Sequence, residues 1–363
     1  MIKRNISIDI IKGIGIVLMV LGHSQFPLTH FIYLFHMPIF FIASGYLFDF
    51  ASQSDAHSLV CFIKRKFKGL WLPFFVWNTI FIVLNNLFVL LHIYHTDTYN
   101  FVQYPDTIYI NSHFFSLKET IIEVVKSMFL IGGTALTGAL WFLRELLMVL
   151  ILFALINFLL RDKQCKTKLI IHGIFAIVFL IFGWIIQQMK IPSTTSIGTM
   201  CSVYFLIYIG ALFKHVSFEE KLSRHRLLST IVVFALLICF NFFGSIDLAD
   251  NIYSNPLFLV IVSILGWIFL WNISYGIKRN KIFTDVLCYL GKNTMPIIAL
   301  NFICFKPITY FLIEIEQLPI QYLAAYPVLK SNNFLWIIYT MTSILLALLL
   351  NTVYKKFCFR KDR

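Results

Sequence analysis

The chain has 363 residues, of which 59% are apolar and only 13% are charged, and it contains 39 phenylalanines. Soluble globular domains carry about a quarter charged residues, and no single soluble core of this length buries so much apolar surface. The composition therefore excludes a soluble enzyme, a disordered chain, a collagen-like chain and a disulfide scaffold. The class that remains is a multi-pass helical membrane protein.

Long apolar runs separated by short polar connectors predict an all-α membrane protein with about ten transmembrane helices. A single integral-membrane domain over residues 1–363 accounts for all of them. The expected spans, in chain order, are 8–27, 31–50, 69–91, 139–160, 168–188, 198–213, 227–243, 256–275, 294–313 and 334–353.

The formal net charge of +13 is concentrated in alternate connectors and in both tails. Lys and Arg favour cytoplasmic loops, so this pattern predicts that both termini are cytoplasmic. Because the basic residues are scattered rather than gathered on one domain, nucleic acid is not an expected partner. No CxxC motif occurs, and no metal is expected. The basic connectors are 51–68, 161–167, 214–226 and 276–293.

Ionisable side chains inside a membrane are costly and usually functional. Among them, Lys12 and His23 are eleven residues apart, which on a helix is three turns plus about 20°, so they share one face. Their separation along the axis is about 16 Å. The glycines nearby are typical of helix packing, whereas the whole arrangement favours a ligand groove. The ionisable residues within or at the ends of the expected spans are Asp9, Lys12, His23, His36, Asp49, Arg144, Glu145, His172 and Lys306.

Four expected helices carry polar side chains toward one layer of the membrane. His23 and His36 are equally far from the turn near Thr29, while Arg144, Glu145 and Asn301 come from two later spans. Two simpler explanations stay open: structural ion pairs from Arg144 and Glu145 to neighbouring helices, and a hydrogen bond from His36 to a carbonyl. For Asp9, Asp49, His172 and Lys306, snorkelling at the span ends is the simple explanation.

Five ordered segments of the chain resemble the membrane acyltransferase family 3, most closely its fucose-4-O-acetylase-like branch. They are IDIIKGIGIVLMVLGHS (Ile8–Ser24), FHMPIFFIASGYLF (Phe35–Phe48), KRKFKGLWLPFFVW (Lys64–Trp77), GALWFLRELL (Gly138–Leu147) and GKNTMPIIALNF (Gly291–Phe302).

This resemblance implies an O-acyltransferase of the bacterial cell (inner) membrane, with acyl-CoA, by default acetyl-CoA, as cytoplasmic co-substrate. The acceptor it implies is a hydroxyl of a cell-surface glycan or lipid-linked sugar. The family's hallmark, a basic residue followed eleven positions later by an essential histidine, maps onto Lys12 and His23. Two departures are Lys12, where the wider family mostly has arginine, and Asn301, where relatives are expected to have histidine.

The residues themselves suggest roles consistent with that chemistry. Cations near the cytoplasmic mouth are expected to hold the CoA phosphates. His23 is expected to act either as general base on the acceptor hydroxyl or as the group that accepts the acyl unit. Arg144, Asn301 or a backbone N–H would stabilise the oxyanion, and Glu145 or Asp9 would orient a histidine. The expected phosphate ligands are Lys12, Lys64, Arg65, Lys66, Lys68 and Lys292.

Two other function classes fit the same composition. Ten helices with buried charges also suit a transporter or flippase of a lipid-linked sugar or polysaccharide, although such a protein needs no base at this distance from a phosphate clamp. A non-catalytic assembly partner is the other alternative. Asn301 favours it slightly, and Lys12, His23 and His36 oppose it.

Overall fold

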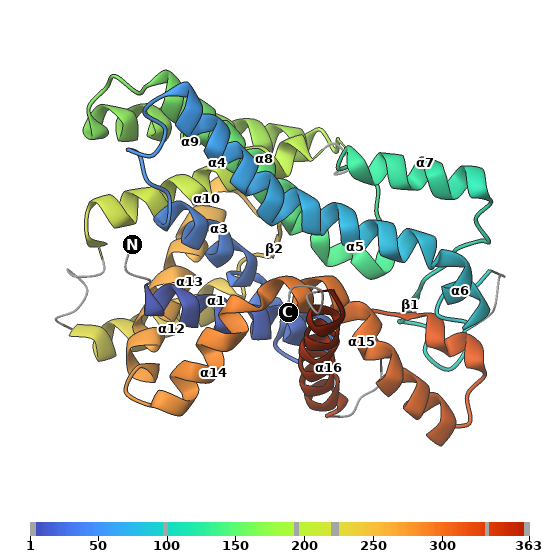
Figure 1. Cartoon of the computed structure of the whole chain (residues 1–363). Coiled ribbons are helices and arrows are strands. Elements are labelled where there is room, and N and C mark those ends of the chain that lie inside the picture. The colour runs from blue at the N-terminus through green and yellow to red at the C-terminus, as the bar shows by residue number, and fades with distance from the viewer. Residues whose placement is uncertain (1–4, 97–100, 192–195, 219–224, 331–333, 359–363) are drawn as a thin grey trace. The chain divides into compact units, whose positions relative to one another are not determined.

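The computed structural model describes residues 5–96, 101–191, 196–218, 225–330 and 334–358 (Figure 1). Several basic residues of the expected connectors and tails lie outside these ranges, namely Lys3, Arg4, Lys221, Arg224, Arg360, Lys361 and Arg363. The described residues are almost entirely helical, and seven of their helices are long and apolar enough to cross a membrane. The prediction of an all-α, multi-pass membrane protein is therefore confirmed.

Seven of the ten expected spans coincide with these long helices, and the other three differ in ways that the sequence explains. The range 227–243 is the shorter apolar helix α12 (Arg226–Phe240). The range 31–50 is divided into α2 (Thr29–Tyr33) and α3 (His36–Tyr46). Pro38 has no N–H for the carbonyl of Leu34, so the helix restarts with the proline in its first turn.

The range 69–91 differs most, because the helix begins thirteen residues earlier, at Ala56. Asp55 caps this start by accepting the N–H of Ser58 at 2.8 Å. A π-helical turn then precedes Pro73, whose ring removes the hydrogen bond to the carbonyl one turn before. The run consists of α4 (Ala56–Lys66), η1 (Phe67–Trp71), α5 (Leu72–Val83) and α6 (Asn85–Leu90).

The chain forms two compact units, which we describe separately. The first unit comprises Met1–Gly15, His30–Leu72 and Trp141–Lys292, and the second comprises Ile16–Thr29, Pro73–Leu140 and Asn293–Arg363. Helix α1 (Ile6–His23) contributes residues to both.

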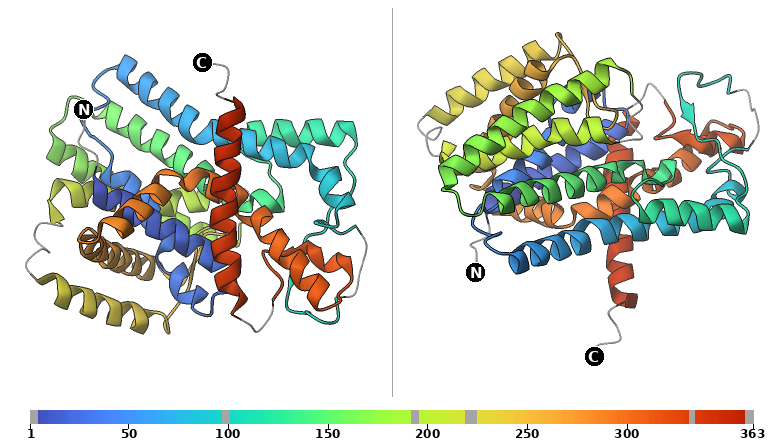
Figure 2. Two further views of the ribbon diagram at one scale, coloured as in Figure 1. Left: turned by 60° about the horizontal axis from the view of Figure 1, so that its bottom comes forward. Right: turned by 90° about the horizontal axis from the view of Figure 1, so that it is seen from above.

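In the first unit, α10 packs against α3, α8 and α9, and Figure 2 shows α8, α9 and α10 side by side. The backbones of α3 and α10 cross closely. A Cβ on Gly210 would lie 2.0 Å from the carbonyl oxygen of Ile42, so glycine is required there. The further helices of this unit are α8 (Trp141–Leu159), α9 (Cys165–Gln188), α10 (Ile197–His215), α13 (Pro256–Ile277) and α14 (Lys281–Lys292), with the hairpin β2 (Ile246–Asp247) and β3 (Ile252–Tyr253).

In the second unit, α15 packs against α16, beside which it lies in Figure 1, and against η2 and η5. Strand β1 pairs antiparallel with β4. The apolar side chains Ile121 and Val125 of helix α7 are exposed, which is typical of a helix that lies on a membrane. The elements are α7 (Leu117–Met128), η2 (Ala135–Leu140), α15 (Thr294–Ile315), η5 (Ile320–Ala324), β1 (Ile108–Tyr109), β4 (Ala325–Tyr326) and α16 (Leu335–Cys358).

His172 and Lys306, which were expected to snorkel, are instead buried. His172 has 0% of its surface exposed and shares a hydrogen bond with the Tyr204 hydroxyl at 2.7 Å. The Lys306 ammonium donates to the carbonyls of Leu323 and Ala325, at 3.0 and 2.7 Å. Snorkelling was the wrong explanation for both, because each polar group has a partner inside the protein.

We expect Lys306→Met to destabilise the second unit, because it leaves two buried carbonyls without their donor. Hydrogen bonds to a charged group contribute about 1.5–3 kcal/mol each. Thermal unfolding of the purified protein should show a lower midpoint for Lys306→Met than for the wild type. Lys330→Met, at an exposed lysine, is the control. An unchanged midpoint for Lys306→Met would show that these two bonds add nothing to stability.

Candidate active site

Lys12 and His23 lie on one unbroken helix, as the sequence predicts. Helix α1 runs from Ile6 to His23, so the histidine is its last residue and Lys12 lies three turns earlier. The rise of an α-helix makes this about 16 Å. Both side chains are partly exposed, whereas Ile11 and Val20 on the same helix are fully buried.

In the second unit, the His23 ring packs against an aromatic side chain. It meets Phe302 edge to face, with ring centroids 4.9 Å apart and an interplanar angle of 73°. Phe302 also contacts Tyr326 at 4.9 Å. The Tyr326 hydroxyl lies 2.9 Å from the place a Cβ on Gly138 would occupy, so the absence of a side chain there leaves room for it. This packing fixes the orientation of the imidazole.

Asn301, on α15, is fully buried one residue before Phe302. Its amide nitrogen donates to the sulfur of Met19 at 3.8 Å, and its amide oxygen accepts the Ser343 hydroxyl at 3.0 Å. Because Met19 is one turn before His23 on α1, Asn301 braces the helix that presents the histidine. The catalytic role expected for Asn301 stays a prediction.

In the first unit, His36 begins α3 and is buried. Its Nδ1 lies 3.1 Å from the carbonyl oxygen of Ile32, and its ring tilts against Tyr33 at 4.9 Å. A carbonyl can only accept, so Nδ1 carries the proton in this bond. The hydrogen bond to a carbonyl that the simpler interpretation expects is therefore present, and it involves one of the two ring nitrogens of His36.

Arg144 and Glu145, on α8, form an ion pair with each other. The Arg144 Nε lies 3.0 Å from Glu145 Oε1, and the two side chains are 17% and 1% exposed. The sequence suggested pairs to neighbouring helices, whereas this pair joins adjacent residues of one helix. Its charges are therefore balanced locally, and any part in catalysis stays a prediction.

Two of the expected phosphate ligands, Lys12 and Lys66, lie close together near the beginning of α1. Burial lowers the pKa of Lys66, at the end of α4, to about 8, and the nearby charges of Arg65 and Lys12 contribute to this shift. The Lys66 ammonium also lies over the ring of Phe62, at 5.1 Å. Mutually repelling cations of this kind favour an anionic ligand. Lys64, Arg65 and Lys68 are exposed on the same helical run.

Lys292 follows Gly291, whose backbone packs closely against the beginning of α1. A Cβ on Gly291 would lie 2.1 Å from the carbonyl oxygen of Asp9, and one on Gly13 would lie 2.1 Å from that of Leu287. The backbones of α1 and α14 therefore touch, as the packing interpretation of these glycines expects. Lys292 follows this contact directly and is exposed.

The lowered pKa of Lys66 predicts that anion binding depends on pH. A bound phosphate favours the charged ammonium, so binding raises the Lys66 pKa again and takes up a proton above pH 8. The affinity should be constant below pH 7 and then fall by up to about tenfold per pH unit between pH 8 and the ordinary lysine pKa. Titrating the purified protein with CoA across this range tests it. Lys66→Arg should bind with no such fall, and an equal fall in that variant would contradict the assignment.

Phe302, which contacts His23, and Tyr326, which contacts Phe302, were not among the residues predicted from the sequence. Phe302 falls within the segment Gly291–Phe302 and could have been inferred from its place beside Asn301. Tyr326 belongs to a loop between α15 and α16, and only the fold brings it to the ring of Phe302.

The model of the acyltransferase 3 family, described as an acyltransferase domain, matches residues 5–352. No curated protein and no solved structure matches the chain. Because the match covers nearly the whole chain, the protein belongs to the acyltransferase 3 family of membrane acyltransferases.

Proposed function

We propose that this protein is an O-acetyltransferase of the bacterial inner membrane, related to the fucose-4-O-acetylase-like branch of its family. Its donor is acetyl-CoA from the cytoplasm, and its acceptor is a hydroxyl of a cell-surface glycan or lipid-linked sugar. The observation that carries the donor half is the cluster of Lys12, Arg65 and Lys66. Burial, together with the charges of Arg65 and Lys12, lowers the pKa of Lys66, and a bound anion would relieve this repulsion.

The catalytic half rests on His23. As general base, its imidazole takes the proton of the acceptor hydroxyl while that oxygen attacks the thioester carbonyl. The carbon–sulfur bond then breaks, and the CoA thiolate leaves and takes up a proton. As nucleophile, the imidazole accepts the acetyl group first and passes it to the acceptor in a second step. Edge-on packing against Phe302 holds the ring in one orientation for either route.

A pocket in the second unit supports a polyhydroxylated acceptor. Its volume is about 190 Å³, and it has amide, hydroxyl and carboxylate groups beside aromatic rings. A few placed polar groups in a partly apolar pocket are typical of small-molecule recognition. The lining includes Asn85, Tyr94, Asn111, Ser112, Phe115, Glu123 and Thr134.

The experiment that tests the function uses purified protein without acceptor. We expect it to bind acetyl-CoA labelled in the acetyl group, and to release free acetate slowly or to retain the label on His23. A transporter of lipid-linked sugars would neither bind nor hydrolyse acetyl-CoA, and it would not become labelled on His23. Absence of both binding and hydrolysis would overturn the proposal and favour the transporter.

The direction of transfer requires cytoplasmic termini, which the charge of the connectors predicts. A reporter fused after Arg363 should be active only in the cytoplasm, and one inserted near Tyr99 only outside. Both positions lie outside the described residues. An external C-terminus would place the basic cluster away from acetyl-CoA and would contradict the proposal.

A further inference from the structure

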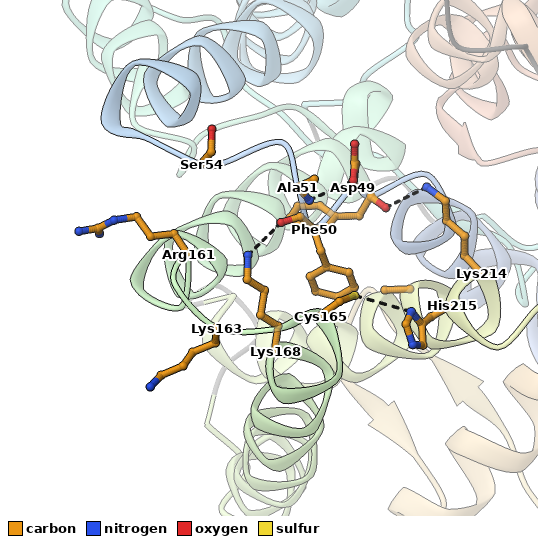
Figure 3. A pocket seen from close by; sticks show the side chains of 12 residues that line it. Asp49, Phe50, Ala51, Ser54, Arg161, Lys163, Cys165, Lys168, Lys214 and His215 are labelled. Atoms are coloured by element: carbon orange, nitrogen blue, oxygen red, sulfur yellow. Dashed lines mark hydrogen bonds between the residues drawn. The ribbon is translucent and has the colours of Figure 1, made fainter.

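A second basic pocket lies in the first unit and includes none of the residues proposed to bind the donor. Its volume is about 650 Å³. It lies where the segment after α3 meets the last residues of α10 and the connector between α8 and α9 (Figure 3). Its lining residues are Phe48, Asp49, Phe50, Ala51, Ser54, Arg161, Lys163, Cys165, Lys168, Ala211, Lys214 and His215.

Two lysines of this pocket are held in place by backbone carbonyls. Lys168 is only 7% exposed, and its ammonium donates to the carbonyl of Phe50 at 3.1 Å. The ammonium of Lys214 donates to the carbonyl of Phe48 at 3.2 Å. In Figure 3 both ammonium groups point toward the backbone of residues 48–51. Each ammonium has three donors and uses one of them here, so the others can bind a ligand.

The charge of the pocket is not balanced. Within the described part of the chain, neither Lys168 nor Lys214 forms a salt bridge. Arg161 and Lys163 extend outward at the rim in Figure 3. The pocket's one carboxylate, Asp49, already accepts the N–H of Ala51 at 3.0 Å. Arg161 also lies 3.9 Å from the exposed carboxylate of the next residue, Asp162. Lys163, Lys168 and Lys214 therefore line the pocket beside a single carboxylate, and a buried ammonium without a counter-ion favours a bound anion.

The beginning of α9 adds to this field. The helix has 24 residues, and its N-cap, Gln164, makes no side-chain hydrogen bond to the first turn. Cys165, the first helical residue, lines the pocket. The free N–H groups and the positive end of the dipole at a helix N-terminus attract anions, and here they act beside Lys168.

We propose that this pocket binds a phosphate group of an anionic ligand at a site separate from the donor cluster. Two sources share this chemistry: the headgroup of an acidic phospholipid, and a soluble phosphate compound such as a nucleotide. The proposal does not depend on acyl transfer, because binding alone is measured.

Binding of pyrophosphate to the purified, full-length protein tests the site. We compare Arg161→Gln/Lys163→Gln with the matched control Arg279→Gln/Lys281→Gln, which removes the same two charges, at the same spacing, from exposed positions of another connector. Both pairs are also combined with Lys12→Ala, so that binding at the donor cluster does not hide the result. The pocket variant should bind pyrophosphate about tenfold more weakly, whereas the control should stay within about twofold.

A further variant reports on the buried lysine. Lys168→Gln should weaken binding at least as much, and Lys168→Arg should restore it, provided that both unfold near the wild-type temperature. The rim variant remains decisive if Lys168→Gln does not fold. Equal affinities of the pocket variant and its matched control would overturn the proposal.

Two additional arms identify the source of the phosphate. In the first arm, the protein is unfolded in nanodiscs of phosphatidylglycerol and of phosphatidylcholine. If phosphatidylglycerol stabilises it more, and only Arg161→Gln/Lys163→Gln loses this difference, the ligand is a lipid headgroup. Displacement of pyrophosphate by CoA in the Lys12→Ala background would identify a soluble nucleotide. Either result supports the site. If Lys12→Ala alone abolishes all pyrophosphate binding, the pocket is not a phosphate site, whatever the outcome for acyl transfer.

Discussion

Replacing His23 with alanine is expected to reduce acyl transfer by about 10²–10⁴-fold, the usual cost of removing a general base. The variant should still be present in the membrane at normal abundance, because the imidazole is only half buried and belongs to the last residue of α1. CoA binding should survive, since the basic cluster around Lys12 is untouched. Acetyl transfer or acetyl-CoA hydrolysis by equal amounts of purified protein measures the loss.

Two further histidine variants make this test specific. His57→Ala, at an exposed residue of α4, should have wild-type activity. His36→Ala should cost less than His23→Ala, because one nitrogen of His36 already bonds to a backbone carbonyl. If His36→Ala is inactive while His23→Ala retains most of its activity, the catalytic histidine has been assigned wrongly. If both remain active, transport becomes the better interpretation of the buried charges.

Replacing Lys12 with alanine is expected to raise the KM for acetyl-CoA by about 10–100-fold, with a smaller change in kcat. A charge-assisted hydrogen bond to phosphate contributes about 1.5–3 kcal/mol, which gives this range. Lys12→Arg should be mild, because a guanidinium also binds phosphate. Initial rates at varied acetyl-CoA concentration separate KM from kcat.

The matched control for this prediction is Lys281→Ala, at an exposed lysine near the opposite end of α14 from Gly291. It removes one lysine charge from an exposed position outside the proposed phosphate site and should leave KM unchanged. Identical kinetics of Lys12→Ala and the wild type would remove Lys12 from the phosphate site. A loss confined to kcat would assign Lys12 to the chemical step instead.

The long helices and the spacing of Lys12 and His23 could be predicted from the sequence, because both depend on local geometry. Apolar runs of sufficient length form helices in lipid, whose backbone groups must be satisfied within the segment. Eleven residues on an uninterrupted helix return to nearly the same face whatever surrounds them. Likewise Pro38 and Pro296 lie in the first turns of α3 and α15, where the missing N–H costs least.

Only the tertiary structure decided which distant groups meet. Three contacts join segments that are far apart in the chain. Lys66 lies near Lys12, Phe302 packs against His23, and Lys306 donates to the carbonyl of Leu323. In the second basic pocket, Lys168 comes from the first turn of α9 and Lys214 from the last turn of α10. Hydrophobic periodicity shows that a helix is buried, but not which neighbour covers it. A buried polar side chain takes whichever partner the packing brings within hydrogen-bond distance.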